Sequence, residues 1–221
     1  MAQLLSAIIF DMDGVLCDSE PFICEAAIRM FGATYGQKVE AADFLPFVGT
    51  GENRYLGGVA EKYGIRLDIE RDKARTYEIY LEIIPGRLRP FPGVHEFIGE
   101  CRRRALKLAV ATSADRIKLD GNLRELDFPP DTFDACVTGS EVRRKKPFPD
   151  LFLAAARRLG IEPARCVVVE DAPSGILAAR RAGARCLGLT TGFAAALLVE
   201  AGANWTAPDL ARAPRELFDG A

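Results

Sequence analysis

From residue 106 onward, short apolar runs alternate with longer segments whose apolar residues recur at helical spacing. Strands that alternate with helices in this way form a parallel sheet with helices packed on its faces. A first apolar run near the N-terminus adds one more strand. The predicted strands cover residues 7–10, 106–112, 134–138, 166–170 and 185–189. The predicted helices of the repeat cover residues 116–126, 150–160 and 173–182.

Residues 21–84 break this rhythm, because they contain no continuous β-branched run and their apolar residues recur at helical spacing. One helix is marked by Phe22, Ala26, Ala27 and Met30, and another by Tyr77, Tyr80, Leu81 and Ile84. The segment that returns to the sheet, residues 85–93, is rich in proline and glycine and predicts a hinge.

The predicted architecture is an α/β fold: a Rossmann-like parallel-sheet core with an inserted all-α cap. The core is expected to comprise residues 1–17 and 89–221, and the cap residues 18–88. Residues 209–221 predict a short C-terminal helix with a frayed end.

Composition excludes several classes of function. The chain has 221 residues, 49% apolar and 27% charged, and a net charge of −2 with both signs interspersed. This pattern lacks the basic footprint of a nucleic-acid-binding protein, so neither nucleic acid nor a membrane surface is expected as a partner. No apolar run approaches the roughly 20 residues that a membrane span requires.

The cysteines and the histidine give no pattern of metal ligands. The six cysteines are Cys17, Cys24, Cys101, Cys136, Cys166 and Cys186. They are not closely paired and His95 is the only histidine, so no zinc site is expected. We expect the cysteines to be reduced structural thiols in a reducing compartment. His95 is expected on the outer face of a helix after the hinge.

Two acids follow the first predicted strand. Asp11 and Asp13 come directly after an apolar run, and Gly14 allows the chain to turn there. Ligands of open α/β sheets bind at the carboxyl ends of the strands. Two acids this close would differ in role, one ionised as nucleophile and metal ligand, the other carrying a proton. A plain acidic turn is the alternative for this motif alone.

Polar side chains also follow the other predicted strands. Thr112 and Ser113 follow the second, Lys146 comes after the third, and Glu170 and Asp171 end the fourth. Separately, these residues could be a helix cap, a basic surface and a buried acid pair. Together they supply a nucleophile, donors for phosphoryl oxygens and carboxylates for a hard metal ion. The set therefore predicts a site for phosphoryl chemistry.

These motifs resemble the haloacid dehalogenase superfamily of phosphatases and phosphomutases. Four motifs characterise that superfamily. In this chain Asp11-Met-Asp13-Gly-Val resembles the first, Thr112 the second, Lys146 the third and Glu170-Asp171 the fourth. The helical insertion resembles the cap of the β-phosphoglucomutase-like branch. The resemblance implies a Mg²⁺-dependent phosphatase that hydrolyses a small phosphorylated metabolite through an aspartyl phosphate.

The resemblance also implies roles for individual residues. Asp11 would be the nucleophile and Asp13 the general acid and base. Thr112, Ser113 and Lys146 would bind the phosphoryl group. The metal ligands would be Asp11, Asp13 through its carbonyl, Glu170 and Asp171. A cap loop that contains Gly49, Thr50, Gly51 and Glu52 would face the substrate, with Asn53 as a further polar contact.

A narrower resemblance involves the segments 47–52, 56–60, 78–81 and 113–118, which are similar to the phosphatase domain of plant and algal suppressor-of-quenching proteins. In that family the domain is joined to further domains and faces the chloroplast stroma. The resemblance implies the same location for this chain; otherwise a cytoplasmic one is expected.

One position departs from the phosphomutases of this branch. A histidine there follows the Asp-Ser-Glu type of segment, and this chain has Ile23 instead. The difference favours hydrolysis over sugar phosphomutase activity. A regulatory domain with little turnover remains an alternative. The helical insertion and Asp13 argue against an aspartate-phosphorylated receiver domain, and Asp13 also argues against a dehalogenase.

Overall fold

All four residues of β1 (Ala7–Phe10) are buried, as expected for a central strand of a parallel sheet. The computed structural model describes residues 4–218 of the chain and has one six-stranded sheet with the order β3-β2-β1-β4-β5-β6. Every neighbouring pair is parallel, and β1 lies between β2 and β4. The other strands are β2 (Lys107–Ala111), β3 (Ala135–Val137), β4 (Cys166–Glu170), β5 (Arg185–Leu189) and β6 (Trp205–Ala207).

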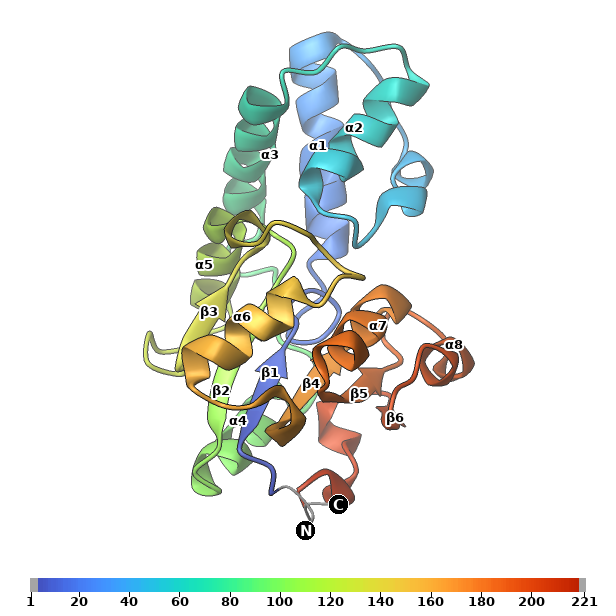
Figure 1. Cartoon of the computed structure of the whole chain (residues 1–221). Coiled ribbons are helices and arrows are strands. Elements are labelled where there is room, and N and C mark those ends of the chain that lie inside the picture. Colours follow the sequence, from blue (N-terminus) through green and yellow to red (C-terminus); the bar gives the residue numbers. More distant parts are fainter. Residues whose placement is uncertain (1–3, 219–221) are drawn as a thin grey trace.

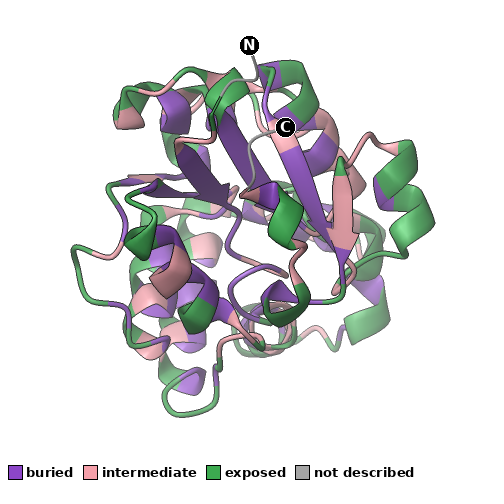
Figure 2. Cartoon of the chain, turned by 90° about the horizontal axis from the view of Figure 1, so that it is seen from below, coloured by how far each residue is buried: buried purple, intermediate pink, exposed green. Residues whose placement is uncertain are grey.

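The sheet separates two apolar cores, because successive side chains of a strand point to opposite faces. Ala7 and Ile9 belong to one core, while Ile8 and Phe10 belong to the other. The first core also contains residues of α6 (Asp150–Leu159), α7 (Pro173–Ala182) and α8 (Ala195–Glu200). The second contains residues of α4 (Val94–Arg103) and α5 (Arg116–Glu125). Figure 2 shows the buried strands between these helical layers.

Local sequence signals set the ends of α7 as predicted. Pro173 is its first residue, where the missing N–H has no intrahelical partner to lose. Gly183 follows the last residue with a φ of 85°, a left-handed conformation that glycine adopts without steric strain.

Three helices form a separate bundle above the carboxyl ends of the strands (Figure 1). They are α1 (Glu20–Tyr35), α2 (Glu52–Lys62) and α3 (Ile69–Ile83), with short 3₁₀ turns at Ala41–Asp43 and Leu45–Phe47. All three lie between β1 and β2 in the sequence, so the predicted α/β fold with an inserted helical cap is confirmed. The proposed boundaries of the cap, residues 18 and 88, stay a prediction.

The helix α2 was not among the predicted helices. Its sequence contains Gly57 and Gly58, which lower helix propensity. Gly58 has a packing role, since a Cβ there would lie 2.2 Å from the ring of Phe47. The absence of a side chain therefore lets the preceding turn pack against the helix. The short elements α8 and β6 were also not predicted.

The prediction of a C-terminal helix over residues 209–221 is wrong for the residues that can be described. Two 3₁₀ turns, Leu210–Arg212 and Arg215–Leu217, lie there instead. Pro214 separates them, because a proline disfavours helical backbone at the residue before it. Residues 219–221 lie outside the described part of the chain.

The cap and the core are joined by a buried hydrogen-bond chain. The Tyr80 hydroxyl on α3 donates to Asn122 Oδ1 on α5, with an O···O distance of 2.6 Å. Asn122 Nδ2 in turn donates to Cys17 Sγ at 3.8 Å. All three side chains are buried, so water cannot replace a missing partner. This chain of hydrogen bonds holds the cap helix α3 against α5 of the core.

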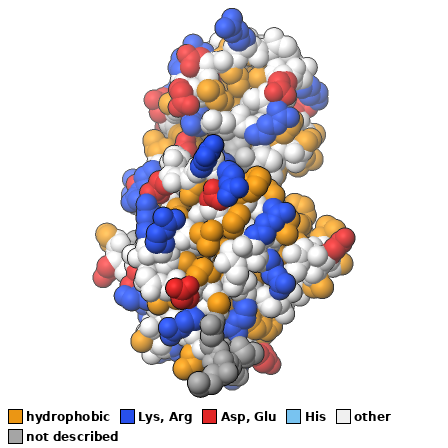
Figure 3. All heavy atoms as spheres, viewed as in Figure 1, with side chains coloured by type: hydrophobic (Ala, Val, Ile, Leu, Met, Phe, Trp, Pro, Cys, Tyr) orange, Lys and Arg blue, Asp and Glu red, His pale blue; other side chains and the backbone are white. Residues whose placement is uncertain are grey.

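The surface carries both signs of charge. On the face drawn in Figure 3, basic side chains are frequent where the cap meets the core, with acidic ones among them. Within residues 4–218, no helix is both long enough and apolar enough to cross a bilayer.

Replacing Tyr80 by phenylalanine should lower the free energy of unfolding by about 1–3 kcal/mol, because Asn122 Oδ1 would lose its donor in a buried position. Urea denaturation measures this change. Tyr63→Phe is the matched control: its hydroxyl donates to Asp43, which keeps Lys62 and the Glu40 N–H as donors. An equal or larger loss in the control would contradict the role assigned to Tyr80.

Candidate active site

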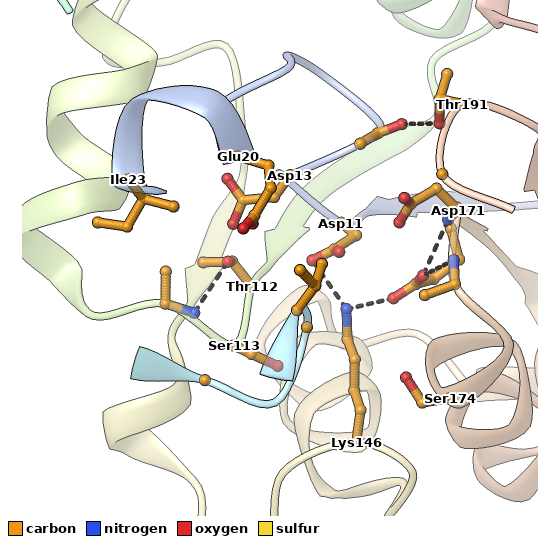
Figure 4. Close-up of a pocket in the computed structure, with 18 of the residues that line it drawn as sticks. Asp11, Asp13, Glu20, Ile23, Thr112, Ser113, Lys146, Asp171, Ser174 and Thr191 are labelled. Carbon is orange, nitrogen blue, oxygen red and sulfur yellow. Dashed lines mark hydrogen bonds and ion pairs between the residues drawn. The ribbon is translucent and has the colours of Figure 1, made fainter. Parts of the chain in front are cut away.

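The sheet order brings the predicted residues to one edge. The chain proceeds from β1 to β2 on one side and returns to β4 on the other, and ligands of α/β sheets bind at such a switch point. Asp11 follows β1, Thr112 follows β2, and Glu170 and Asp171 end β4. They line a cavity of about 700 Å³ between sheet and cap. Figure 4 shows Asp11 with Lys146 on one side and Asp13 on the other.

Lys146 is the central cation of this site. Its Nζ lies 2.9 Å from Asp11 Oδ1 and also forms an ion pair with Glu170 Oε1. Burial disfavours the ammonium group, but the charges of Asp11 and Glu170 outweigh this effect and raise the pKa of Lys146. The protonated lysine therefore holds two carboxylates beside each other.

Glu170 is fully buried and its remaining oxygen is used for structure. Glu170 Oε2 accepts hydrogen bonds from the backbone N–H groups of Asp171 and Ala172, both at 2.9 Å. Gly175 makes room for the carboxylate, since a Cβ there would lie 1.8 Å from Glu170 Oε1. The first turn of α7 is thus shaped around this side chain.

Asp171 lies against the turn that follows β1. A Cβ on Gly14 would lie 2.1 Å from Asp171 Oδ2, and Gly14 has a φ of 79°, so this position requires glycine for two reasons. The Thr191 hydroxyl donates to the Gly14 carbonyl and fixes the same turn. The backbone thereby allows Asp171 to approach Asp11.

The crowded carboxylates repel one another. Burial, together with Glu170 and Asp13, raises the pKa of Asp11 to about 7 although Lys146 opposes the shift. Burial, Glu170 and Asp11 raise the pKa of Asp171 to about 9. One lysine therefore does not offset the negative charge at this edge of the sheet.

The same group fits a divalent cation. Ligand oxygens of Asp11, Glu170 and Asp171 all lie within 4.8 Å of one another. Asp11 Oδ1 is buried and, despite its ion pair with Lys146, accepts no hydrogen bond with suitable geometry. An all-oxygen set with an unsatisfied carboxylate suits Mg²⁺.

Asp13 points away from the three carboxylates. Its Oδ1 accepts a hydrogen bond from the Ser19 hydroxyl and forms an ion pair with Lys118 at 2.9 Å. The Asp13 side chain is 29% exposed and lines the cavity. The carboxylate is therefore held beside the cap, apart from Asp11, Glu170 and Asp171.

Sequence reasoning missed Lys118 as a site residue. It lies on α5 with only 3% of its surface exposed, and its Nζ is 5.7 Å from the centre of the Tyr80 ring. Burial disfavours the ammonium, but Asp13, Tyr80 and Glu52 outweigh it and raise the pKa of Lys118. The available signal was its place among the apolar positions of the helix, one residue before the buried Leu119.

Thr112 and Ser113 lie where they were predicted. Thr112 is buried, and its hydroxyl oxygen accepts the Ala114 N–H at 3.1 Å. The Ser113 carbonyl accepts a hydrogen bond from Lys145 Nζ at 3.2 Å. Both residues line the cavity that Asp11 also lines, as predicted from their place after β2.

The predicted cap loop contributes only in part. Gly49, Gly51 and Glu52 line the cavity, but Thr50 does not, and its hydroxyl donates to the Phe47 carbonyl at 2.6 Å. Asn53 is exposed and is not a lining residue either. The cap side of the cavity also contains three side chains from other elements: Glu20, Ile23 and Tyr55.

Comparison with known proteins identifies the family. A family model described as haloacid dehalogenase-like hydrolase matches residues 5–183, which is most of the chain. The chain belongs to the haloacid dehalogenase-like hydrolases. The resemblance inferred from the four motifs is confirmed. Membership of this family also confirms the prediction that the chain is a hydrolase.

Two curated relatives are informative. This chain is 44% identical over 209 residues to the chloroplastic protein SUPPRESSOR OF QUENCHING 1 of Arabidopsis thaliana, which confirms the narrower resemblance. The match covers 93% of this chain and 20% of that protein, so the chain spans about a fifth of its relative's length. It is also 35% identical to the phosphorylated carbohydrates phosphatase of Thermotoga maritima, covering 81% of this chain and 82% of that one.

A solved structure supports the same fold. CbbY from Rhodobacter sphaeroides, in complex with xylulose-(1,5)bisphosphate, superposes with a TM-score of 0.81 at 26% identity. The match covers 96% of each chain, so cap and core are both represented in it.

Mg²⁺ should raise the unfolding temperature more at high than at low pH. The raised folded-state pKa values of Asp11 and Asp171 mean that the metal-free protein binds extra protons and loses stability as pH rises through about 4 to 9. The cation relieves this repulsion, whereas protons compete with it at about pH 6 more than at about pH 8. Thermal unfolding with Mg²⁺ or a chelator measures the effect. Asp171→Asn should reduce the Mg²⁺-dependent shift, and an equal shift at both pH values would contradict the assignment.

Replacing Lys118 by methionine should lower kcat by about 10- to 100-fold, because Asp13 loses the cation that orients it. Methionine keeps most of the unbranched stem that packs near Tyr80. Lys73→Met is the control. It removes a similar ion pair, with Asp115 at 3.0 Å, and neither Lys73 nor Asp115 lines the cavity. Comparable kcat values in both variants would show that Lys118 does not act on Asp13.

Proposed function

We propose that this chain is a Mg²⁺-dependent phosphatase that hydrolyses a small phosphorylated metabolite through an aspartyl phosphate on Asp11. The observation that carries the proposal is the setting of Asp11. Asp11 lines the cavity beside Asp13, and its Oδ1 forms an ion pair with Lys146 Nζ at 2.9 Å without accepting a hydrogen bond of suitable geometry. A carboxylate nucleophile needs this combination of access, a cation for the phosphoryl oxygens and an acid at the leaving group.

Two residues carry the chemistry in this proposal. The Asp11 carboxylate attacks phosphorus, which forms a carboxylate–phosphorus bond as the bond to the leaving oxygen breaks. Asp13 donates its proton to that oxygen. Water then attacks the phosphorus of the aspartyl phosphate, Asp13 accepts a proton from the water, and Asp11 is released with inorganic phosphate.

Other residues bind the transferred group. Lys146, Thr112 and the backbone of Ser113 are placed to hold phosphoryl oxygens. Asp11 and Asp171 would hold Mg²⁺ with the Asp13 carbonyl, and Glu170 as a ligand or a support. The cation would supply a positive charge for the developing phosphoryl oxyanions.

The cap would exclude water and select the leaving group. Its apolar residues Leu45 and Val48 lie across the cavity from Phe193 of the core, and all three line it. Apolar contacts at the rim favour closure over a bound substrate. The phosphatases among the relatives, one of them named for fructose-1-phosphate, support a small phosphorylated metabolite as substrate.

The relation to the chloroplastic relative supports a chloroplast stroma location and a place within a longer protein with further domains. Sugar phosphomutase activity is disfavoured by Ile23, which is 3% exposed, lines the cavity and can neither donate nor accept a proton. A regulatory domain with little turnover is the remaining rival, and turnover decides between them.

The test compares Asp11→Asn with the parent chain. Phosphate release from p-nitrophenyl phosphate and a panel of metabolite phosphates, with Mg²⁺, should fall by about 10³-fold or more, because the amide is not a nucleophile. Asp120→Asn, on the exposed face of α5 and paired with Arg116, is the control and should keep full activity.

Three results would count against the proposal. Asp11→Asn activity within tenfold of the parent would exclude Asp11 as nucleophile. A folded parent chain with no phosphate release from any ester would favour the regulatory rival. Conversion of β-glucose 1-phosphate to glucose 6-phosphate faster than phosphate release would favour a mutase.

A further inference from the structure

Glu52 is an unusual residue in the cap wall of the cavity. It is the first residue of α2, only 8% of its surface is exposed, and it lines the cavity. Its Oε2 is buried and accepts no hydrogen bond from any residue between 4 and 218. A buried acceptor without a donor is destabilising, so such groups persist where a ligand supplies the missing partner.

Among the described residues, no side chain forms an N-cap hydrogen bond at the start of α2. The backbone N–H groups of Arg54 and Tyr55 donate to the Gly51 carbonyl, so backbone hydrogen bonds form the first turn of α2. Burial raises the pKa of Glu52, and Lys118 partly opposes this shift without forming an ion pair with it. Glu52 lines the cavity and its Oε2 accepts no hydrogen bond from the described residues, although the carboxyl group also interacts with its own backbone N–H and with Tyr77 of α3.

A second acid, Glu20 on α1, lines the same side. Its Oε1 accepts a hydrogen bond from the Tyr55 hydroxyl at 2.7 Å, and burial raises its pKa to about 7. Glu20 and Glu52 thus give the cap wall two carboxylates from two different helices. Figure 4 shows Glu20 beside Asp13, on the side of the site away from Lys146.

Among the described residues that line the cavity, no unpaired lysine or arginine balances this wall. Seven carboxylates and two lysines line the cavity, and no arginine is among its lining residues in the described chain. Lys146 is paired with Asp11 and Glu170, and Lys118 with Asp13. A second phosphate on a substrate would therefore meet carboxylates at the cap, with no unpaired lysine or arginine among the described lining residues. Lys145 Nζ lies beside Gly51 and donates to the Ser113 carbonyl at 3.2 Å.

We propose that Glu52 selects the substrate class: phosphate monoesters whose leaving group carries hydroxyl or amino donors, with no second phosphate. A donor on the leaving group satisfies Glu52 Oε2, while an anionic group is repelled by Glu52 and Glu20. The inference rests on the proposed phosphatase function, since it assigns the leaving group to the cap side of the same cavity. The proposed substrate class, with one phosphate, differs from the bisphosphate bound in the CbbY structure.

The test uses three probes that share a six-membered ring. Glucose 6-phosphate carries hydroxyl donors, cyclohexylmethyl phosphate lacks them, and glucose 1,6-bisphosphate adds a second phosphate. The parent chain should hydrolyse glucose 6-phosphate with a kcat/KM about tenfold or more above the other two. Glu52→Gln should lower that value by about tenfold and leave cyclohexylmethyl phosphate within about twofold, because a charge-assisted hydrogen bond is lost.

Two further variants sharpen the comparison. Glu52→Lys should reverse the order of glucose 6-phosphate and the bisphosphate. Glu82→Gln, an exposed acid on the cap helix α3, should change none of the three values. The unfolding temperature of Glu52→Gln should change little, because Oε2 accepts no hydrogen bond from the described residues and glutamine keeps one oxygen for the interactions with Tyr77 and the backbone. A clear drop would assign Glu52 a structural role instead.

Binding separates this inference from the proposed function. Titration calorimetry of the three probes against Asp11→Asn, with and without Glu52→Gln and with Mg²⁺ present, requires no turnover. A preference for glucose 6-phosphate that Glu52→Gln removes would support the inference even if the parent chain released no phosphate. Equal affinities, tighter binding of the bisphosphate, or an equal effect of Glu52→Gln on all three probes would overturn it, even for an active phosphatase.

Discussion

Three carboxylates share one buried lysine at the carboxyl edge of the sheet, and much of the surrounding structure accommodates this crowding. Lys146 pairs with Asp11 and Glu170, yet the pKa of Asp11 is still raised to about 7. Uncompensated charge of this kind is destabilising in a folded protein. It persists here because the neighbouring backbone is built around it, with glycines at 14 and 175 where a Cβ would strike a carboxylate. The arrangement makes physical sense when a cation and a phosphoryl group enter the site.

The second constraint is the coupling of the cap to this edge. Asp13 is held by Ser19, which precedes α1, and by Lys118 on α5. Lys118 lies near Tyr80, whose hydroxyl bonds Asn122 one turn further along α5. Asp13, the proposed general acid, is thus held by residues that also join cap and core. A movement of the cap relative to α5 would change the surroundings of Asp13, which provides a route from substrate binding to the position of the acid.

The sequence predicted the parts of the fold that depend on local patterns. Apolar runs of strand length, and the acids that end them, gave β1 and β4 with Asp11, Glu170 and Asp171 in place. The helix α2 was missed because Gly57 and Gly58 lower helix propensity, while the packing of Phe47 on Gly58 is a tertiary contact. Lys118 was missed because a lysine on a polar helix is usually solvated, and its place beside Leu119 is a weak signal compared with its contact with Asp13 in the structure. The loop at 49–52 was predicted as a unit, but neighbouring residues of a turn point in different directions, so Glu52 faces the cavity and Thr50 does not.

Two buried carboxylate oxygens in the described chain accept no hydrogen bond of suitable geometry: Asp11 Oδ1, which has only its ion pair with Lys146, and Glu52 Oε2. Both residues line the same cavity. One lies at the sheet edge beside Lys146, and the other comes from the cap. Buried acceptors are nearly always satisfied in folded proteins, so two such oxygens in one cavity indicate a place for a ligand rather than a contribution to stability. In the proposed function they would correspond to the two ends of a phosphate ester: a phosphoryl group with its cation at Asp11, and a donor-bearing leaving group at Glu52. A ligand that satisfied both oxygens would bridge core and cap, and its binding energy would then favour the closed arrangement in which water is excluded from Asp11.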